Sequence, residues 1–393
     1  MNWSKSILIA AAFFAATQVQ AQDNLINALK GNASDNSKEG FKFTEVINLG
    51  RTSIKDQGSS GTCWSYSGNS FLESEMIRMG KDPVEISQLY TARNTYVEKA
   101  KNFVRLHGDQ AQGDGGQLHD VLTIFRKYGA VPYDVYTGLP DGQTRNNFSE
   151  MSPILQSITE SVAKSKKPTK NWLKAFTGAM DSYLGEVPEN FQYKGKSYTP
   201  RTFADQVIGI NPDDYVGISS FNEHAYYKPF VLLIPDNWSF ESFYNVKMND
   251  LTDIIDKALD KGFTVAWATD VSEKTFSWKN GVAFVPEKPI EKMNKEEVDQ
   301  LFNGPKPEAN ITEDQRQEAF DNYETTDDHG MHIVGKVKDQ NGKEYYIVKN
   351  SWGVSNDYQG YLYATKEFVK YKTISLLVHK KALEKNMQKL LGI

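Results

Sequence analysis

Cys63 is the only cysteine in the 393-residue sequence, and a run of small residues leads into it. This run, residues 58–62, reads Gly-Ser-Ser-Gly-Thr, and a helical pattern begins at the cysteine. A thiol at a helix N-terminus feels the positive end of the helix dipole, which favours the thiolate that attacks a carbonyl carbon. The position predicts a nucleophile, with a buried structural cysteine as the alternative.

A second group of residues, toward the C-terminal end, supplies the partners that a nucleophilic thiol needs. His329 precedes a strand-like segment, and Asn350 opens the sequence Asn-Ser-Trp-Gly, residues 350–353. A histidine can take the proton of a thiol, and an asparagine can hold the imidazole in one orientation. The three residue types predict a catalytic set of Cys63, His329 and Asn350.

Two histidines, His329 and His332, could serve as the base, and strand geometry separates them. The segments 331–338 and 344–348 have strand patterns, and Asn341-Gly342 between them is a hairpin turn signal. We expect a hairpin with an even number of loop residues. In such a hairpin the sequence numbers of any two residues that pair across the strands have an odd sum.

This register places His329 on the same face of the hairpin as Asn350 and turns His332 to the opposite face. With four loop residues, Trp352 lies opposite His329 and Asn350 lies diagonally beside it. His332 is therefore expected to be a packed or partly exposed strand residue. A β-bulge would reverse the parity.

Together these segments resemble the papain-like cysteine peptidases. Gln57 precedes Cys63 by six residues, as the oxyanion-hole glutamine of that family precedes its nucleophile, and Cys63-Trp64 repeats the family's pair. The Asn-Ser-Trp-Gly segment matches letter for letter. The resemblance implies that Gln57 stabilises the oxyanion, that Trp352 shields the histidine and asparagine, and that Gly115 and Gly116 hold the substrate backbone.

The length of the chain and the absence of disulfides narrow the resemblance to one branch. In the papain branch the histidine and asparagine follow the cysteine by about 130 to 150 residues, whereas His329 follows Cys63 by 266 positions (329 − 63). The sequence Ser-Ser-Gly-Thr-Cys-Trp is similar to bleomycin hydrolase and bacterial aminopeptidase C. That branch is long, carries an insertion and does without disulfides.

The same branch implies an aminopeptidase, because its C-terminus lies in the cleft and captures the substrate's amino group. Here Ile393 would be that residue. The tail could instead form a surface helix with Leu383 and Met387 packed down. A secreted endopeptidase and an inactive peptide-binding homologue remain the alternatives. Intracellular members of the branch assemble as hexameric barrels, which leaves a homo-oligomer open here.

The elements that must position these residues follow from periodicity. Apolar spacing predicts a helix from Cys63 to Gly80, a second helix capped by Ser87, and a third over 116–128. Strand patterns begin at Phe263 and continue to His379. We expect an α+β, papain-like fold with a helical lobe, an antiparallel, β-barrel-like lobe and a large insertion.

The N-terminal residues carry the features of a signal peptide. Lys5 precedes the apolar run 7–16, and Val19-Gln20-Ala21 suits cleavage. We expect a secreted or periplasmic bacterial protein without stable membrane insertion. The expected organisation is a signal peptide (1–21) and a peptidase domain (22–393), the latter divided into a helical lobe (about 41–140), an insertion (about 141–249), a β lobe (about 250–381) and a C-terminal tail (382–393).

Composition limits the partners. The net charge is −5 and the pI about 5.8, without a basic run, which argues against a nucleic-acid surface. Histidines lack ligand-like spacing and no cysteine pair exists, so neither a metal nor a cofactor is expected. Peptides are the expected substrates. The sequence does not determine the role of the insertion, which could be a lid, an oligomer contact or an addition without a function of its own.

Overall fold

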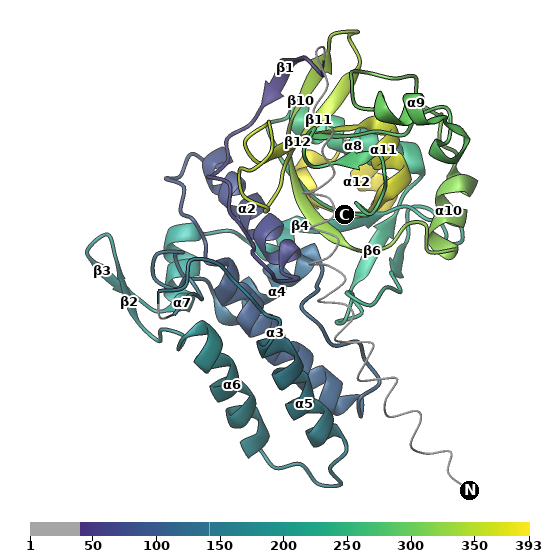
Figure 1. Ribbon diagram of the computed structural model, residues 1–393. Coiled ribbons are helices and arrows are strands. Elements are labelled where there is room, and N and C mark those ends of the chain that lie inside the picture. Colours follow the sequence, from purple (N-terminus) through teal and green to yellow (C-terminus); the bar gives the residue numbers. More distant parts are fainter. Residues whose placement is uncertain (1–39, 141) are drawn as a thin grey trace, which may run out of the picture.

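The computed structural model describes residues 40–140 and 142–393, and the expected signal peptide lies outside these residues. Figure 1 shows a helical lobe and a lobe built on a large sheet, with the first long helix between them. This arrangement confirms the predicted α+β fold with a helical lobe and a β lobe.

Three helices predicted from periodicity form the centre of the helical lobe. They are α2 (Cys63–Arg78), α3 (Gln88–Arg105) and α4 (Leu118–Tyr128). The hydroxyl of Ser87 accepts a hydrogen bond from the backbone N–H of Tyr90 at 3.0 Å, which caps α3 as expected. Gly129, with φ of 81°, ends α4.

Helix α2 is buried along most of its length because it lies between the other helices and the sheet. At Gly68 an added Cβ would meet the Val121 side chain of α4 at 2.4 Å, so the close approach of these helices requires glycine. This packing makes the N-terminus of α2 a rigid support for Cys63.

The second lobe is an 11-stranded sheet of mostly antiparallel strands, with order β5-β6-β4-β13-β7-β10-β11-β12-β9-β8 and with β1 paired to β10. Its strands are β1 (Phe43–Asn48), β4 (Tyr215–Ser219), β5 (Pro229–Val231), β6 (Ser242–Asn245), β7 (Val265–Thr269), β8 (Phe276–Ser277), β9 (Val282–Ala283), β10 (His329–Asp339), β11 (Glu344–Lys349), β12 (Tyr361–Thr365) and β13 (Thr373–His379). The β4–β6 and β9–β12 pairs are parallel.

The remaining helices cover the sheet or flank it. They are α8 (Met248–Asp260), α9 (Lys295–Asp299), α10 (Glu313–Asp321), α11 (Lys366–Lys372) and α12 (Lys385–Leu391). Leu251 and Ile255 of α8 share one core cluster with Trp267 of β7 and Phe368 of α11. The sequence analysis did not predict α8.

The interval 141–249 divides between the two lobes. Its first part contains α5 (Met151–Ala163), α6 (Asn171–Leu184), the hairpin of β2 (Phe191–Tyr193) and β3 (Lys196–Tyr198), and α7 (Pro200–Phe203). Leu155 and Met180 from this part join the helical core, and Figure 1 shows α5 and α6 beside α3. Its last part supplies β4, β5 and β6, which extend the sheet beyond β13.

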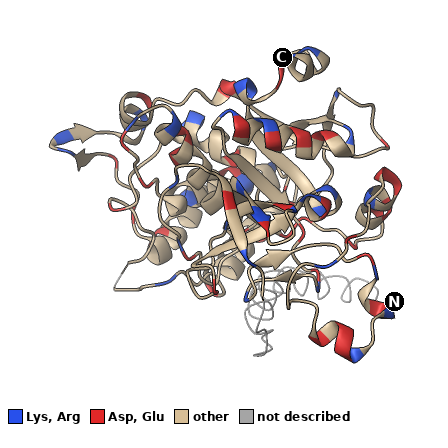
Figure 2. Cartoon of the chain, turned by 90° about the horizontal axis from the view of Figure 1, so that it is seen from above, with Lys and Arg blue, Asp and Glu red and all other residues tan. Residues whose placement is uncertain are grey.

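Charged residues of both signs are distributed over the two lobes, as Figure 2 shows. Within residues 40–140 and 142–393, no helix combines the length and the apolar character needed to cross a bilayer.

Candidate active site

Cys63 is the first residue of α2 and is 6% exposed. The backbone N–H of Gly330 is directed at its sulfur. A Cβ at Gly330 would lie 3.1 Å from the Cα of Trp64, so glycine allows the start of β10 to approach the start of α2. This contact brings His329, the residue before Gly330, to the nucleophile.

His329 and Asn350 are joined by a hydrogen bond of 2.7 Å between the ring Nε2 and the amide Oδ1. Both residues are 3% exposed. The Asn350 oxygen also accepts the backbone N–H of Ser351 at 2.7 Å, which fixes the orientation of the amide. The oxygen therefore faces the ring, and Nε2 carries the proton of this hydrogen bond.

The hairpin of β10 and β11 reaches the predicted pairing by a route that the sequence analysis did not predict. Lys338 pairs with Glu344, which leaves the five residues 339–343 between the paired positions, so the expected even loop is wrong. A β-bulge at Val334 inserts one extra residue into β10 and reverses the parity again. His332 then pairs with Lys349, and His329 and Asn350 share a face.

Trp352 covers the histidine. Its ring centroid lies 4.6 Å from that of His329, with 36° between the planes, and it is 2% exposed. An indole over the imidazole excludes water from the His329–Asn350 hydrogen bond, which strengthens that bond electrostatically.

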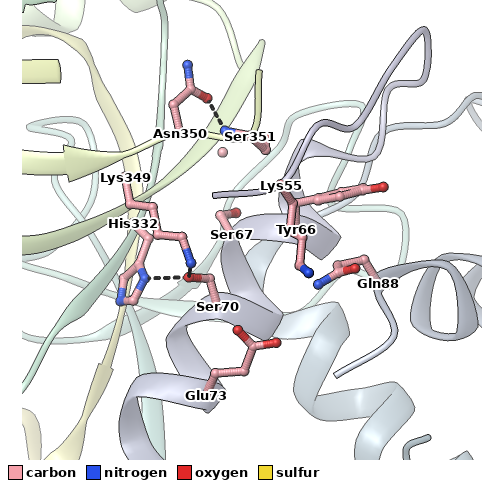
Figure 3. A pocket seen from close by; sticks show the side chains of 11 residues that line it. Lys55, Tyr66, Ser67, Ser70, Glu73, Gln88, His332, Lys349, Asn350 and Ser351 are labelled. Carbon is pink, nitrogen blue, oxygen red and sulfur yellow. Dashed lines mark hydrogen bonds between the residues drawn. The ribbon is translucent and has the colours of Figure 1, made fainter. Parts of the chain in front are cut away.

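His332 lies on the opposite face of β10 and contacts α2, as the strand argument predicts. Its Nδ1 is 3.0 Å from the hydroxyl of Ser70, which also accepts from the ammonium of Lys349 at 2.8 Å. Figure 3 shows these side chains together with Glu73 in a small, mostly enclosed pocket. His332 is fully buried there, so its packing is structural.

Gln57 is fully buried and held at both ends of its amide. Its Oε1 accepts from the hydroxyl of Ser351 at 2.6 Å, and its Nε2 donates to the carbonyl of Ser60 at 2.7 Å. The backbone N–H of Gln57 donates to the carbonyl of Ser351 at 2.8 Å. The glutamine is thus fixed between the loop before Cys63 and the segment that carries Asn350.

The glycine pair lies against the tryptophan that follows the nucleophile. A Cβ at Gly116 would meet the ring of Trp64 at 2.9 Å, and the Trp64 Nε1 donates to the carbonyl of Asp114 at 2.9 Å. A Cβ at Gly115 would meet the carboxylate of Asp236 at 2.2 Å. Gly115 and Gly116 are therefore placed beside Cys63-Trp64, as the resemblance implies.

Ile393 is not placed at this site, contrary to the expectation for a tail in the cleft. It lines another cavity with Tyr215 and Phe243. Leu383 and Leu391 are buried in the core of the sheet lobe, and the Lys261 ammonium donates to the carbonyl of Leu383 at 3.1 Å. The C-terminal tail therefore packs on the sheet lobe through apolar side chains, which agrees with the alternative prediction of a surface helix.

Burial opposes charge on the two reacting groups. It raises the pKa of the Cys63 thiol to about 12, to which Asp236 and Asp327 add, and it lowers the pKa of the His329 imidazole to about 4. The structure thus favours a neutral resting pair, whereas the sequence analysis expects a thiolate and an imidazolium. Moving the proton from thiol to imidazole forms both charges together, so their attraction offsets part of the burial penalty.

Two carboxylates at this site, Asp236 and Asp327, were not predicted from the sequence. The charges of both carboxylates raise the pKa of the Cys63 thiol. Asp327 lies two residues before His329, so its position could have been noticed. Asp236 lies 173 positions after Cys63 (236 − 63), in the interval whose role the sequence left open, and no local pattern points to it.

Comparisons with known proteins agree with this geometry. A model of the Peptidase C1-like family matches residues 1–392. Aminopeptidase G of Lactobacillus delbrueckii subsp. lactis is 24% identical, over 92% of this chain and 89% of that protein. "Cysteine proteinase 1, mitochondrial" of Saccharomyces cerevisiae is 22% identical, over 98% and 86%. The crystal structure of PepW from Lactobacillus rhamnosis has a TM-score of 0.69 at 21% identity, covering 95% and 91%, and shares the fold.

Proposed function

The chain belongs to the Peptidase C1-like family and is a cysteine-type peptidase, and we propose that it is an aminopeptidase with Cys63 as its nucleophile. The observation that carries the assignment of residues is the hydrogen bond between His329 and Asn350, buried beneath Trp352, beside the thiol. This arrangement suits a histidine that exchanges its second proton with a neighbouring sulfur.

Catalysis would begin with transfer of the Cys63 proton to His329. The sulfur then attacks the carbonyl carbon of the first peptide bond, a C–S bond forms, and the carbonyl oxygen becomes an oxyanion. His329 gives its proton to the leaving amine as the C–N bond breaks. Water, deprotonated by the same imidazole, hydrolyses the thioester and restores the thiol.

The oxyanion would be stabilised by the backbone N–H of Cys63 and by the amide of Gln57. The N–H groups in the first turn of a helix point out of its N-terminus, toward the side from which the substrate approaches the thiol. The Gln57 amide is held rigid by Ser351 and Ser60. Donors fixed in advance need no reorganisation when the charge develops.

The names of the relatives support release of single residues from the amino terminus. Aminopeptidases G, C and E of several lactic-acid bacteria match more than four-fifths of this chain. An endopeptidase is the second candidate, because Ile393 packs outside the cleft and cannot block a longer substrate there.

A pair of substrates tests both parts of the proposal. The enzyme should hydrolyse a free-amino aminoacyl coumarin amide and leave its N-acetylated form almost untouched, and Cys63→Ala should abolish hydrolysis and labelling by an epoxide inhibitor. Turnover by the alanine variant would end the nucleophile assignment. Equal cleavage of both substrates would favour the endopeptidase.

Secretion is proposed separately, from the features of residues 1–21. Expression of the full chain in a bacterium should give a mature protein that begins near Gln22 and is found outside the cytoplasm. N-terminal sequencing of the purified protein checks this. An intact N-terminus recovered from the cytoplasm would refute it.

A further inference from the structure

The loop between β5 and β6, residues 232–241, places the carboxylate of Asp236 against Gly115 of the glycine pair. Both carboxylate oxygens of Asp236 lie 2.2 Å from the position that a Cβ on Gly115 would occupy. The carboxylate therefore covers the glycine that is expected to hold the substrate backbone. Asp236 is half-buried.

The loop is built to hold this residue in place. The side-chain amide of Asn237 donates to the carbonyls of Leu232 and Glu241, at 2.9 Å each, which closes the loop on itself. The buried Trp238 donates from its Nε1 to Asp120 at 2.8 Å, which ties the loop to α4. Asp236 directly precedes these two anchoring residues.

Asp236 receives no hydrogen bond from any residue in the ranges 40–140 and 142–393, although its neighbours are satisfied. Asp327 accepts from Gln117 at 2.6 Å, and Asp114 accepts from Ser152 at 2.6 Å. The positive charge of Lys99 lowers the pKa of Asp236. Its ammonium, however, donates to the carbonyls of Gly113 and Gly115, at 2.8 and 2.6 Å. The carboxylate is thus left with acceptor capacity directed at the cleft.

Among the described residues, carboxyl groups outnumber ammonium groups around Asp236. Asp114, Asp120, Asp236 and Asp327 act on one another or on the thiol, and the Lys99 ammonium acts on Asp120 and Asp236. Burial raises the pKa of Asp236 to about 6 and that of Asp327 well above its ordinary value. The Oδ1 of the fully buried Asp120 also lacks a hydrogen-bond partner among the described residues. A cation bound among these groups would stabilise their ionised forms.

The cation that fits is an ammonium group. Among the described residues no group of His, Cys, Asp or Glu side chains has the arrangement that would hold a metal ion. A carboxylate beside the glycine pair and close to the nucleophile is instead where the free amino group of a peptide would arrive, if its first peptide bond lay at Cys63.

We propose that Asp236 binds the α-ammonium of the peptide substrate and so confers aminopeptidase specificity. This inference rests on the proposed function and assigns its specificity to a side chain of the β5–β6 loop, because the C-terminal tail lies elsewhere. Asp236 also closes the cleft over Gly115, which excludes a longer chain on the amino-terminal side of the scissile bond.

Binding of the ammonium also assists the nucleophile. In the free enzyme Asp236 and Asp327 raise the pKa of Cys63. A positive charge beside Asp236 cancels part of this field, so the thiolate forms more readily when a free amino terminus is bound. An acetylated substrate provides no such charge.

The substitution Asp236→Asn tests the proposal because it keeps the shape and removes the charge. The value of kcat/KM for a free-amino aminoacyl coumarin amide should fall about 10- to 100-fold, as expected for loss of a hydrogen bond between charged groups. Hydrolysis of the N-acetylated form should stay the same or rise. Alkylation of Cys63 by iodoacetamide at neutral pH should stay the same or become faster.

The control is Glu241→Gln, which removes the same charge from the exposed end of the same loop and should change none of these rates. If wild-type enzyme prefers the free amine and Asp236→Asn keeps that preference, the role of Asp236 is refuted. A parallel loss of peptide hydrolysis and of alkylation would mean that Asp236 is structural. If wild-type enzyme shows no preference, the proposed aminopeptidase function itself has failed.

Discussion

Replacing Asn350 by alanine is the substitution that tests the catalytic geometry most directly. It removes the oxygen that lies 2.7 Å from the Nε2 of His329, in a site where both residues are 3% exposed. A hydrogen bond to a charged group contributes about 1.5 to 3 kcal/mol. If that bond is made to the imidazolium form, kcat should fall about 10- to 160-fold, since about 1.4 kcal/mol is tenfold in rate.

The same substitution should shift the pH dependence in a defined direction. The oxygen of Asn350 favours the imidazolium and so raises the pKa of His329, against the larger, opposing effect of burial. Without the oxygen, the imidazolium loses its proton at a lower pH. Because the resting pair is neutral, this deprotonation sets the acid limb of kcat/KM, which should move to lower pH by about one unit or more.

The assay combines steady-state hydrolysis with the rate of Cys63 alkylation, both over a pH range that extends below the His329 pKa of about 4. Asn356→Ala is the matched control, because Asn356 is also buried, accepts from Gly360 and donates to Tyr361, and is not bonded to His329. It should lower stability without moving the limb. An unchanged limb and rate in Asn350→Ala, with folded protein, would refute the proposed role of the hydrogen bond.

Three further predictions follow from the same site. Gln57→Ala should lower kcat about 100- to 1000-fold with little change in KM, because one oxyanion donor is lost; a change confined to KM would contradict this. His329→Asn should abolish hydrolysis, whereas His332→Asn should keep kcat within about twofold. His332→Asn should also lower the free energy of unfolding by about 1 to 2 kcal/mol, measured by urea denaturation. Loss of activity in folded His332→Asn would mean that His332 and not His329 is the base. Burial raises the pKa of the Glu73 carboxyl from 4.5 to about 7. The unfolded chain releases this proton at a lower pH than the folded protein does, so the folded state loses stability as the pH rises from 4.5 to about 7. As the pH rises from 5 to 8, the free energy of unfolding of Glu73→Gln should therefore increase relative to that of wild type, by at most about 3 kcal/mol. If the difference between the two proteins did not change with pH, Glu73 would be ionised over the whole range.

Much of the site followed from local patterns. The glycine-rich turn into a helix predicts a thiol at a helix N-terminus, and the alternation of strands separates His329 from His332. Both survive in the structure because they depend on short-range geometry. The register of the hairpin shows where local reasoning stops. An odd loop and a bulge at Val334 each change the parity, and together they restore the predicted pairing.

The interval between the lobes could not be interpreted from the sequence, because its parts pack against different partners. Leu155 of α5 is buried in the helical core, whereas β4 pairs with β13, far along the chain. The position of the tail was equally undecided, since Leu383 and Leu391 are compatible with a surface helix or with a free extension.

The residue types and the order of the catalytic groups are properties of the sequence itself, because a nucleophile, a base and its orienting amide are recognisable by chemistry and spacing. Three-dimensional packing alone decided which carboxylate shares the cleft with them. The β5–β6 loop brings Asp236 over Gly115 while apolar burial keeps Ile393 away. Such contacts join residues more than a hundred positions apart. The free energy that stabilises them comes from burial of the whole core, and a local sequence pattern cannot predict it.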